Sequence, residues 1–260
     1  MLDQLDIEEL KRIARLAGDE ILQVYGSDFV VDEKADESPL TEADRRANVV
    51  ILAELQKLYP EVPFISEETK ALSFAERRQW DYLWMIDPLD GTKEFVKRNG
   101  EFTVNIALVK AGVPVAGVVY QPTEDKMYFA VQGRGAFVQV ADQPARLLSG
   151  GESYRDAAVD PVRVVASRSH LSEAVTEFVK DLEQSGRSVE FLSSGSSLKL
   201  CMVAEGAADV YPRLAPTMEW DTAAADAVVR EAGKEVLQFE TGEALLYNKE
   251  NLLNPWFVVE

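Results

Sequence analysis

Apolar positions near the start of the chain follow the spacing of two amphipathic helices. In the segment 10–25 they recur every three or four residues along one face, and Gly26 then predicts the end of the helix. Thr41 is a suitable N-cap for a second helix, whose apolar positions in the segment 49–55 lead to a stop at Tyr59-Pro60. The pattern therefore predicts two helices in this first part of the chain.

Further along, the pattern changes to short apolar runs separated by turn residues, which is typical of strands. Four strands are predicted, at residues 102–109, 113–120, 127–131 and 136–140. The turns between them fall at Gly112, Gln121-Pro122 and Gly133-Arg134-Gly135. We expect this part of the chain to form an antiparallel sheet with the two helices packed on it.

A polar, turn-rich stretch at residues 146–161 separates this pattern from a second one. After it, strands and helices alternate, which favours an α/β arrangement. The predicted strands are at 162–166, 189–192 and 209–211, and the predicted helices are at 172–184, at 196–205 and from about residue 221. The sequence therefore predicts an N-terminal α+β half, residues 1–145, and a C-terminal α/β half, residues 146–260.

The composition is that of a globular protein with a strongly acidic surface. The 260 residues are 47% hydrophobic and 28% charged, and the formal net charge of −18 disfavours binding to nucleic acid polymers and to anionic lipid. No apolar run approaches the roughly 18 residues of a membrane span, and the acidic N-terminus does not resemble a signal peptide. The single cysteine, Cys201, excludes an internal disulfide. We expect a cytoplasmic protein with no transmembrane segment.

The most informative segment is 83–92, where an apolar run ends in two carboxylates three positions apart. A strand would carry Asp87 to the edge of a sheet, and Pro88 and Gly91 would then form a tight turn that brings Asp90 beside it. Two oxygen ligands on one turn suit Mg²⁺, and the NH groups after Asp90 suit a phosphate oxygen. An ordinary acidic turn is the alternative, because Asp, Pro and Gly are common in turns.

Three other segments also place acidic residues at the end of an apolar run or at the start of a predicted helix. Residues 63–69 form a short apolar run that ends in paired acids, residues 38–44 open the second helix with Ser-Pro-Leu-Thr-Glu-Ala-Asp, and residues 219–224 open another helix with Glu-Trp-Asp-Thr-Ala-Ala. Together with the segment 83–92, they resemble the lithium-sensitive, Mg²⁺-dependent phosphatase superfamily of inositol monophosphatase. The likeness runs from about Lys34 to about Gly233.

Within that superfamily, three phrases are similar to the 3′(2′),5′-bisphosphate nucleotidases. They are Gly-Ser-Ser-Leu-Lys at 195–199, Val-Ala-Glu-Gly-Ala-Ala-Asp-Val-Tyr-Pro-Arg at 203–213, and Thr-Met-Glu-Trp-Asp-Thr at 217–222. The resemblance implies an α+β and α/β fold arranged as the family's layered α-β-α-β-α sandwich. It also implies a role in sulfur metabolism, in which the 3′-phosphate of 3′-phosphoadenosine 5′-phosphate is hydrolysed to give AMP and phosphate. The sulfated precursor, 3′-phosphoadenylyl sulfate, is a further expected substrate.

The resemblance assigns metal ligation to the side chains of Glu67, Asp87, Asp90 and Asp221 and to the main-chain carbonyl of Leu89. Four converging carboxylates without cations would repel one another and raise their own pKa values, so a metal site is favoured over a structural acid cluster. Two Mg²⁺ ions about 4 Å apart can stabilise charge on the entering and leaving oxygens and acidify the attacking water. The family also implies a third, looser Mg²⁺ near the glutamate.

For activation of the water, the resemblance implies a hydrogen-bonded pair of Thr92 and Asp44, with Glu67 holding the same water through metal. A different role for Asp44 stays open, because it lies three residues after Thr41, where an acid can complete a helix capping box. The sequence thus gives Asp44 two candidate roles, one in catalysis and one in helix capping.

Substrate recognition is expected to draw on the C-terminal half. Ser196 and Lys199 lie one turn apart at a helix start, and together with Arg213 they suit a second phosphate. The resemblance assigns them the 5′-phosphate that is not cleaved, and it assigns a contact with the nucleoside to His170, the only histidine. The remaining members of the predicted substrate-binding set are Asp90, Gly91, Thr92 and Asp221.

Two other functions stay open. Relatives with the same fold act on inositol phosphates or sugar bisphosphates, although Lys199 and Arg213 argue against this class of substrate. A non-catalytic metal-binding module is a further alternative, but a calcium loop that begins at Asp87 would need its bidentate Glu where Arg98 stands. The sequence leaves open whether the protein is a monomer or a homodimer and whether it associates with the inner membrane surface.

Overall fold

The structure is a computed structural model that describes residues 1–33, 39–70, 72–156, 158–166 and 172–260. Its α-helices are α1 (Ile7–Tyr25), α2 (Glu42–Leu58), α3 (Phe74–Arg77), α4 (Thr92–Val96), α5 (Glu173–Gln184), α6 (Leu198–Glu205) and α7 (Glu219–Glu231). Its strands are β1 (Val31–Glu33), β2 (Pro39–Thr41), β3 (Phe64–Ser66), β4 (Tyr82–Asp90), β5 (Thr103–Lys110), β6 (Val113–Gln121), β7 (Lys126–Val131), β8 (Gly135–Val140), β9 (Arg146–Leu148), β10 (Val162–Ala166), β11 (Val189–Ser193), β12 (Tyr211–Arg213), β13 (Val236–Gln238) and β14 (Phe257–Val259).

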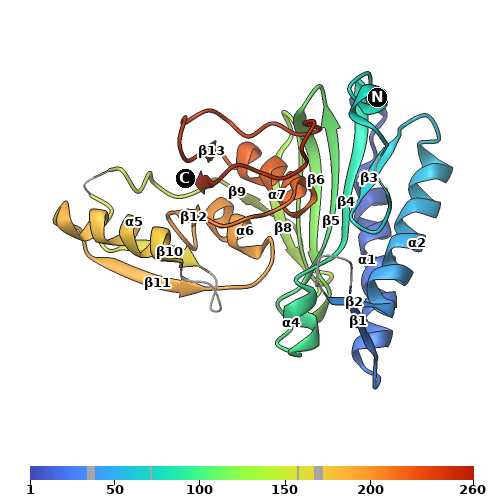
Figure 1. The fold of residues 1–260 in the computed structure, drawn as a ribbon, viewed down its shortest axis with the longest axis horizontal. Helices are drawn as coiled ribbons and strands as arrows, with labels where there is room; N and C mark the ends of the chain where they lie inside the picture. The colour runs from blue at the N-terminus through green and yellow to red at the C-terminus, as the bar shows by residue number, and fades with distance from the viewer. Residues whose placement is uncertain (34–38, 71, 157, 167–171) are drawn as a thin grey trace.

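These elements form five alternating layers (Figure 1). Helices α1 and α2 cover one face of a seven-stranded sheet with the order β3-β4-β5-β6-β7-β8-β9. Helices α6 and α7 lie between its other face and a second group of strands, which comprises the β10-β11 pair and the β12-β14-β13 sheet. Helix α5 packs on the outside of this second group. The predicted α-β-α-β-α sandwich is therefore confirmed.

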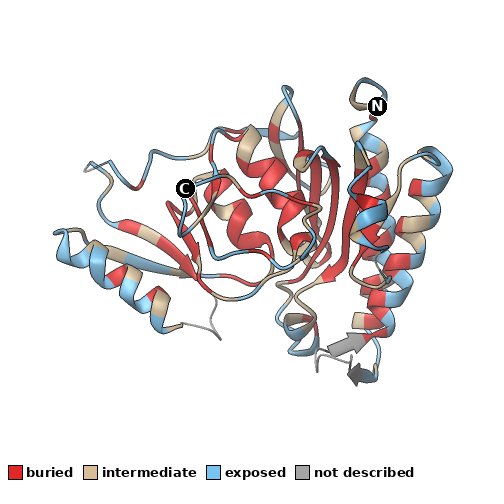
Figure 2. Cartoon of the chain, turned by 45° about the horizontal axis from the view of Figure 1, so that its top comes forward, coloured by how far each residue is buried: buried red, intermediate tan, exposed pale blue. Residues whose placement is uncertain are grey.

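Burial is concentrated on the two faces of the large sheet and on the helices that cover them, as Figure 2 shows, whereas much of α5 is exposed. Helix α7 approaches the sheet closely. A Cβ at Gly117 on β6 would lie 2.2 Å from the carbonyl oxygen of Ala224, so only glycine fits at this position. The small side chains of Ala223, Ala224 and Ala225 are all buried in this contact. Helix α7 is thus fixed against the sheet strands that lie behind the candidate site.

Strand β4 carries the two carboxylates of the central motif. The prediction that a tight turn begins at Pro88 is wrong. The strand continues through Asp90, and its register with β5 shifts between Asp87 and Asp90, so that β4 accommodates one extra residue as a bulge. Positions three apart in a regular strand point to opposite faces, and the bulge instead allows the two carboxylates to meet. The chain then turns at Gly91, whose φ is 89°.

Most of the other predicted elements are confirmed to within a few residues. Thr41 caps α2, and its side chain accepts a hydrogen bond from the NH of Ala43. The helix predicted from residue 196 begins instead at Leu198, because Ser196 has a left-handed φ of 54°. The strand predicted at 209–211 begins at Tyr211, because Val210 forms only an isolated bridge. Within the described ranges, every helix is too short or too polar to span a bilayer.

Candidate active site

Three carboxylates from two distant parts of the chain meet where β4 ends. Asp87 and Asp90 come from the bulged strand, and Asp221 comes from the first turn of α7. Their ligand atoms all lie within 4.8 Å of one another, and they form the one such group of three or more among the residues that the structure describes. The fold thus brings together three of the four side chains that the sequence predicts as metal ligands.

The electrostatics of this cluster disfavour three negative charges without a counter-ion. The pKa of Asp87 is raised well above its ordinary value, first by burial and then by the charges of Glu67, Asp90 and Asp221. The pKa of Asp221 is also raised, by desolvation and by the charge of Asp90. In the part of the chain that the structure describes, none of the three cluster residues forms an ion pair with lysine or arginine. A set of oxygen ligands in this state fits a hard divalent cation.

Main-chain NH groups orient two of these carboxylates. Oδ1 of Asp87 accepts a hydrogen bond from the NH of Leu89 at 3.0 Å, inside the bulge. Oδ2 of Asp221 accepts from the NH of Met218 at 2.9 Å, which caps the first turn of α7. In each case a local backbone group fixes one oxygen, so the direction of the carboxylate follows from the fold of its own segment.

Asp90 is oriented instead by residues from the start of α6. Its Oδ2 accepts from the hydroxyl of Ser196 at 2.7 Å and from the NH of Ser197 at 2.6 Å. The hydroxyl of Ser196 also lies 2.6 Å from that of Thr103, and the hydroxyl of Ser197 donates to Oδ1 of Asn105 at 2.9 Å. Ser196, which the sequence assigned to a phosphate, is therefore bonded to a cluster carboxylate in this structure.

Glu67 lies beside the cluster, outside the group of three. It follows β3, and its NH donates to the carbonyl oxygen of Ile86 at 3.2 Å, which aligns the ends of β3 and β4. Its side chain forms a hydrogen bond with Asp87 and contributes to the raised pKa of that residue. The carbonyl oxygen of Leu89 accepts a long hydrogen bond, 3.4 Å, from the hydroxyl of Thr92. Glu67 and Thr92 thus approach the β4 bulge from different elements.

Asp44 lies between Thr41 and Thr92, so its position is compatible with both of its candidate roles. The residue is fully buried, and its Oδ2 accepts hydrogen bonds from both the NH and the hydroxyl of Thr41 at 2.7 Å, which completes the capping box of α2. Its other oxygen, Oδ1, lies 3.5 Å from the hydroxyl of Thr92. One carboxylate therefore caps the helix with one oxygen and faces Thr92 with the other.

A pocket of about 180 Å³ lies directly beside the acid cluster. Asp90 and Asp221 line it together with Ser196, Lys199 and Arg213, which are the residues predicted to bind the second phosphate. An adjoining pocket of about 380 Å³ shares both acids. The acids and the predicted phosphate-binding cations thus face one space.

The two cations in the smaller pocket have donors to spare. Lys199 is 5% exposed, and burial lowers its pKa to about 8. Its Nζ donates to the carbonyl oxygens of Ser196 at 2.7 Å and of Ser194 at 3.3 Å, which leaves one of its three donors. Nη2 of Arg213 donates to the carbonyl oxygen of Pro216 at 2.9 Å, whereas its buried Nε has no hydrogen-bond partner among the described residues. A buried ammonium and a guanidinium with free NH groups suit an anion such as phosphate.

Lys93 and Tyr211 are among the lining residues that the sequence analysis did not single out. Lys93 lines both pockets, and Tyr211 lines the smaller one, where the centre of its ring lies 5.6 Å from Nζ of Lys199. The position of Lys93 directly after Thr92 was an available signal, but nothing in the pattern distinguishes Tyr211 from a core aromatic residue. His170, predicted to contact the nucleoside, lies outside the described residues.

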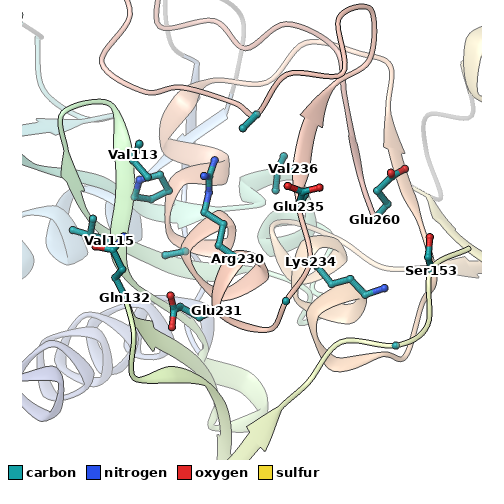
Figure 3. A pocket seen from close by; sticks show the side chains of 15 residues that line it. Val113, Val115, Gln132, Ser153, Arg230, Glu231, Lys234, Glu235, Val236 and Glu260 are labelled. Carbon is teal, nitrogen blue, oxygen red and sulfur yellow. The ribbon is translucent and has the colours of Figure 1, made fainter.

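A larger pocket, of about 690 Å³, lies at the other end of α7, between β6 and β13 (Figure 3). It contains none of the predicted site residues, and its two basic side chains already have partners. Arg230 binds Asp226, and Nζ of Lys234 donates to the carbonyl oxygen of Glu152 at 3.0 Å. The arrangement of charged groups, rather than the size of the cavity, therefore identifies the candidate site.

Comparison with known proteins gives a consistent result. The model of the inositol monophosphatase family matches residues 3–256. The chain is 44% identical to the 3′(2′),5′-bisphosphate nucleotidase CysQ of Salmonella typhimurium, over 97% of this chain and 98% of that protein. The crystal structure of CysQ from Bacteroides thetaiotaomicron is 49% identical and superposes with a TM-score of 0.84, covering 95% of this chain and 94% of that chain. An IMPase from Thermotoga maritima has a TM-score of 0.75 at 25% identity, covering 98% and 91% of the two chains.

Proposed function

The chain belongs to the inositol monophosphatase family, and on this premise we propose that it is a metal-dependent 3′(2′),5′-bisphosphate nucleotidase. The reaction is the hydrolysis of the 3′-phosphate of 3′-phosphoadenosine 5′-phosphate to AMP and phosphate. The likeness to two CysQ proteins over nearly the whole chain supports this substrate. 3′-Phosphoadenylyl sulfate has the same 3′-phosphate and is a further substrate in this proposal.

The position of Lys199 and Arg213 beside the acid cluster carries the proposal. One pocket is lined by these two cations and by Asp90 and Asp221. A phosphate at the acids and a second phosphate at the cations can therefore belong to one small molecule. A substrate with a single phosphate would leave the buried ammonium of Lys199 without an anionic partner, which favours a bisphosphate.

We propose Mg²⁺ as the cofactor, with two or three ions in each site. The ligands would be the side chains of Glu67, Asp87, Asp90 and Asp221 and the carbonyl oxygen of Leu89. When bound, Mg²⁺ neutralises these carboxylates, acidifies a water molecule and stabilises negative charge on the phosphate oxygens. The raised pKa of Asp87 supports this assignment, because it reflects burial of the carboxylate and the charges of Glu67, Asp90 and Asp221.

Proton transfer in this proposal is the work of Thr92 and Asp44. The hydroxyl of Thr92 lies 3.5 Å from Oδ1 of Asp44, so its proton can pass to this carboxylate while the hydroxyl oxygen takes a proton from the attacking water. The two hydrogen bonds from Thr41 hold the carboxylate of Asp44 in this orientation. Glu67 would hold the same water through a bound metal ion. The backbone NH groups after Asp90 would contact the phosphate that is cleaved, which gives Gly91 and Thr92 their place in the substrate site.

The 5′-phosphate would be bound by Lys199 and Arg213, and by Ser196 once its hydroxyl turns away from Asp90. Lys199 and Arg213 would each offer a charge-assisted hydrogen bond, because Nζ of Lys199 keeps one donor beyond its two carbonyl partners and Nε of Arg213 has no partner among the described residues. The nucleoside contact of His170 stays a proposal from the sequence.

The test is phosphate release from 3′-phosphoadenosine 5′-phosphate, measured with Mg²⁺ and with chelator. The matched comparison is 3′-AMP, which lacks only the 5′-phosphate, and the panel also includes inositol 1-phosphate and fructose 1,6-bisphosphate. We expect Mg²⁺-dependent turnover with a clear preference for the nucleotide bisphosphate and 5′-AMP as the product. A preference for inositol 1-phosphate or fructose 1,6-bisphosphate would overturn the substrate assignment, and no release from any of the four would overturn the phosphatase assignment.

A further inference from the structure

The first turn of α7, which carries Asp221, is enclosed by a segment from near the end of the chain. The NH of Glu219 donates to the carbonyl oxygen of Leu252 at 2.9 Å, and the NH of Asn254 donates to that of Thr217 at 2.9 Å. An isolated antiparallel bridge lies between these two bonds. The segment 248–254 therefore runs alongside the start of the helix and is bonded to it at both ends.

Glu219 is the buried acid in this contact. Its side chain is fully buried, and its Oε2 accepts from the NH of Asn248 at 2.5 Å. Its Oε1 accepts from the NH of Lys249 at 3.1 Å and from Nζ of the same residue at 2.5 Å. Three donors from two consecutive residues thus converge on one carboxylate that lies in the same helical turn as Asp221.

Arg77 binds the same segment through the side chain of Asn248 and two main-chain carbonyl groups. It is 3% exposed, and its guanidinium donates to Oδ1 of Asn248 at 2.8 Å and to the carbonyl oxygens of Lys249 and Glu250 at 2.7 and 2.9 Å. Asn248 returns a hydrogen bond from its Nδ2 to the carbonyl oxygen of Arg77 at 2.8 Å. Nε of Arg77 also donates to the carbonyl oxygen of Leu72 at 3.2 Å, two residues before α3 begins.

We propose that four residues form a clamp that positions Asp221: they are Arg77, Glu219, Asn248 and Lys249. The clamp joins α3, through Arg77, to the first turn of α7, through Glu219. This inference rests on the proposed function, because it takes Asp221 as a ligand of the cation site. Carboxylates that repel one another stay close only if the backbone on both sides is fixed, and hydrogen-bonded groups outside the ligand set provide such support in metal sites.

The test is a calorimetric titration of the full chain with Mg²⁺, without substrate, for the wild type and for Glu219→Gln. The substitution keeps the shape of the side chain but replaces an acceptor by an NH₂ group facing donors from Asn248 and Lys249. We expect Mg²⁺ binding to weaken about 10- to 100-fold. The Mg²⁺ concentration for half-maximal phosphate release should rise by the same factor, while KM for the bisphosphate at saturating Mg²⁺ changes less than about twofold.

The matched control is Arg230→Lys, at the other end of α7, which perturbs a buried ion pair without touching the clamp. It should lower the urea midpoint and leave Mg²⁺ affinity unchanged. Lys249→Met is a milder second variant, because the side chain of Lys249 is 31% exposed, and it should weaken Mg²⁺ binding in the same direction even if Glu219→Gln does not fold. Wild-type Mg²⁺ affinity in a folded Glu219→Gln or Lys249→Met variant would overturn the clamp. Absence of Mg²⁺ binding by the wild type would instead overturn the proposed cation site.

Discussion

Two of the carboxylates on helix α7, Asp226 and Asp221, have sharply different surroundings. Asp226 is fully buried, and Arg230 on the next turn donates to both of its oxygens, at 2.7 and 3.1 Å. Tyr247 donates a third hydrogen bond at 2.9 Å. Burial raises the pKa of Asp226, but Arg230 acts in the opposite direction. This acid is neutralised by the protein itself and serves to hold the helix in place.

Asp221, nearer the start of the same helix, faces other acids. Its Oδ2 accepts from the NH of Met218, and its ligand atoms lie within 4.8 Å of those of Asp87 and Asp90. Both desolvation and the charge of Asp90 raise its pKa. The difference teaches how to distinguish the two kinds of buried acid. The negative charge of a carboxylate bonded to an arginine is neutralised within the protein. Carboxylates that face one another require a cation from outside the chain.

The largest effect is expected from the cluster itself. Asp90→Asn removes the charge that acts on both neighbouring acids and weakens an oxygen ligand. Loss of a hydrogen-bonded group that supports a metal ligand typically lowers activity roughly 10- to 100-fold, and turnover should fall by more than this because a ligand itself is changed. The loss should be the same for 3′-phosphoadenosine 5′-phosphate and for 3′-AMP, measured as phosphate release at several Mg²⁺ concentrations. Full activity in this variant would exclude Asp90 from the site.

The second prediction concerns the ion pair between Asp226 and Arg230. Arg230→Leu leaves Asp226 buried without its cation, which should lower the free energy of unfolding by about 3–5 kcal/mol. Urea unfolding followed by circular dichroism measures this change. The folded fraction should bind Mg²⁺ with wild-type affinity, because the ion pair lies outside the cation site. A loss of Mg²⁺ affinity in folded protein would mean that the two ends of α7 are not independent.

A smaller and substrate-specific effect is expected at Lys199. Replacing it by alanine removes a charge-assisted bond to the 5′-phosphate, worth about 1.5–3 kcal/mol, so KM for the bisphosphate should rise roughly 10- to 150-fold. Steady-state kinetics with 3′-AMP provide the control, since that substrate has no 5′-phosphate and should be nearly unaffected. Equal losses on both substrates would contradict the role of Lys199 in binding the second phosphate.

The smallest effect is a dependence on pH. Burial lowers the pKa of Lys199 to about 8, so the ammonium is charged below that pH and loses its proton as the pH rises through it. The value of kcat/KM for the bisphosphate should therefore fall above about pH 8 relative to that for 3′-AMP. In Lys199→Arg, whose guanidinium keeps its charge, the ratio of the two values should stay flat over the same range.

Apolar periodicity predicts the two-part alternation of helices and strands, whereas the layers of the fold and the neighbourhood of the site follow from the family resemblance that a few motifs carry. Thr41 as an N-cap and the strands from residue 102 onwards follow from local patterns, and both are confirmed. The bulge in β4 does not follow from them. Pro88 and Gly91 indicate a turn equally well, and only pairing with β5 determines that the strand continues through Asp90.

Contacts between distant segments are the part that the sequence does not reveal. The bond from Ser196 to Asp90 depends on how α6 docks against the end of β4. The contacts of Glu219 with Lys249 and of Arg77 with Asn248 likewise join segments with no shared pattern. Asp44 is an intermediate case, since the capping box was a candidate from spacing alone, whereas its pairing with Thr92 was expected only from the family resemblance.

The most direct measurement is a calorimetric Mg²⁺ titration of the wild type and of Asp221→Asn, with phosphate release from 3′-phosphoadenosine 5′-phosphate followed on the same samples. The account predicts that the wild type binds Mg²⁺ and hydrolyses the bisphosphate, and that Asp221→Asn loses both properties while remaining folded. Arg230→Lys should retain both. Unchanged Mg²⁺ binding and turnover in Asp221→Asn would contradict the claim that the acids facing one another at the start of α7 are the cation site.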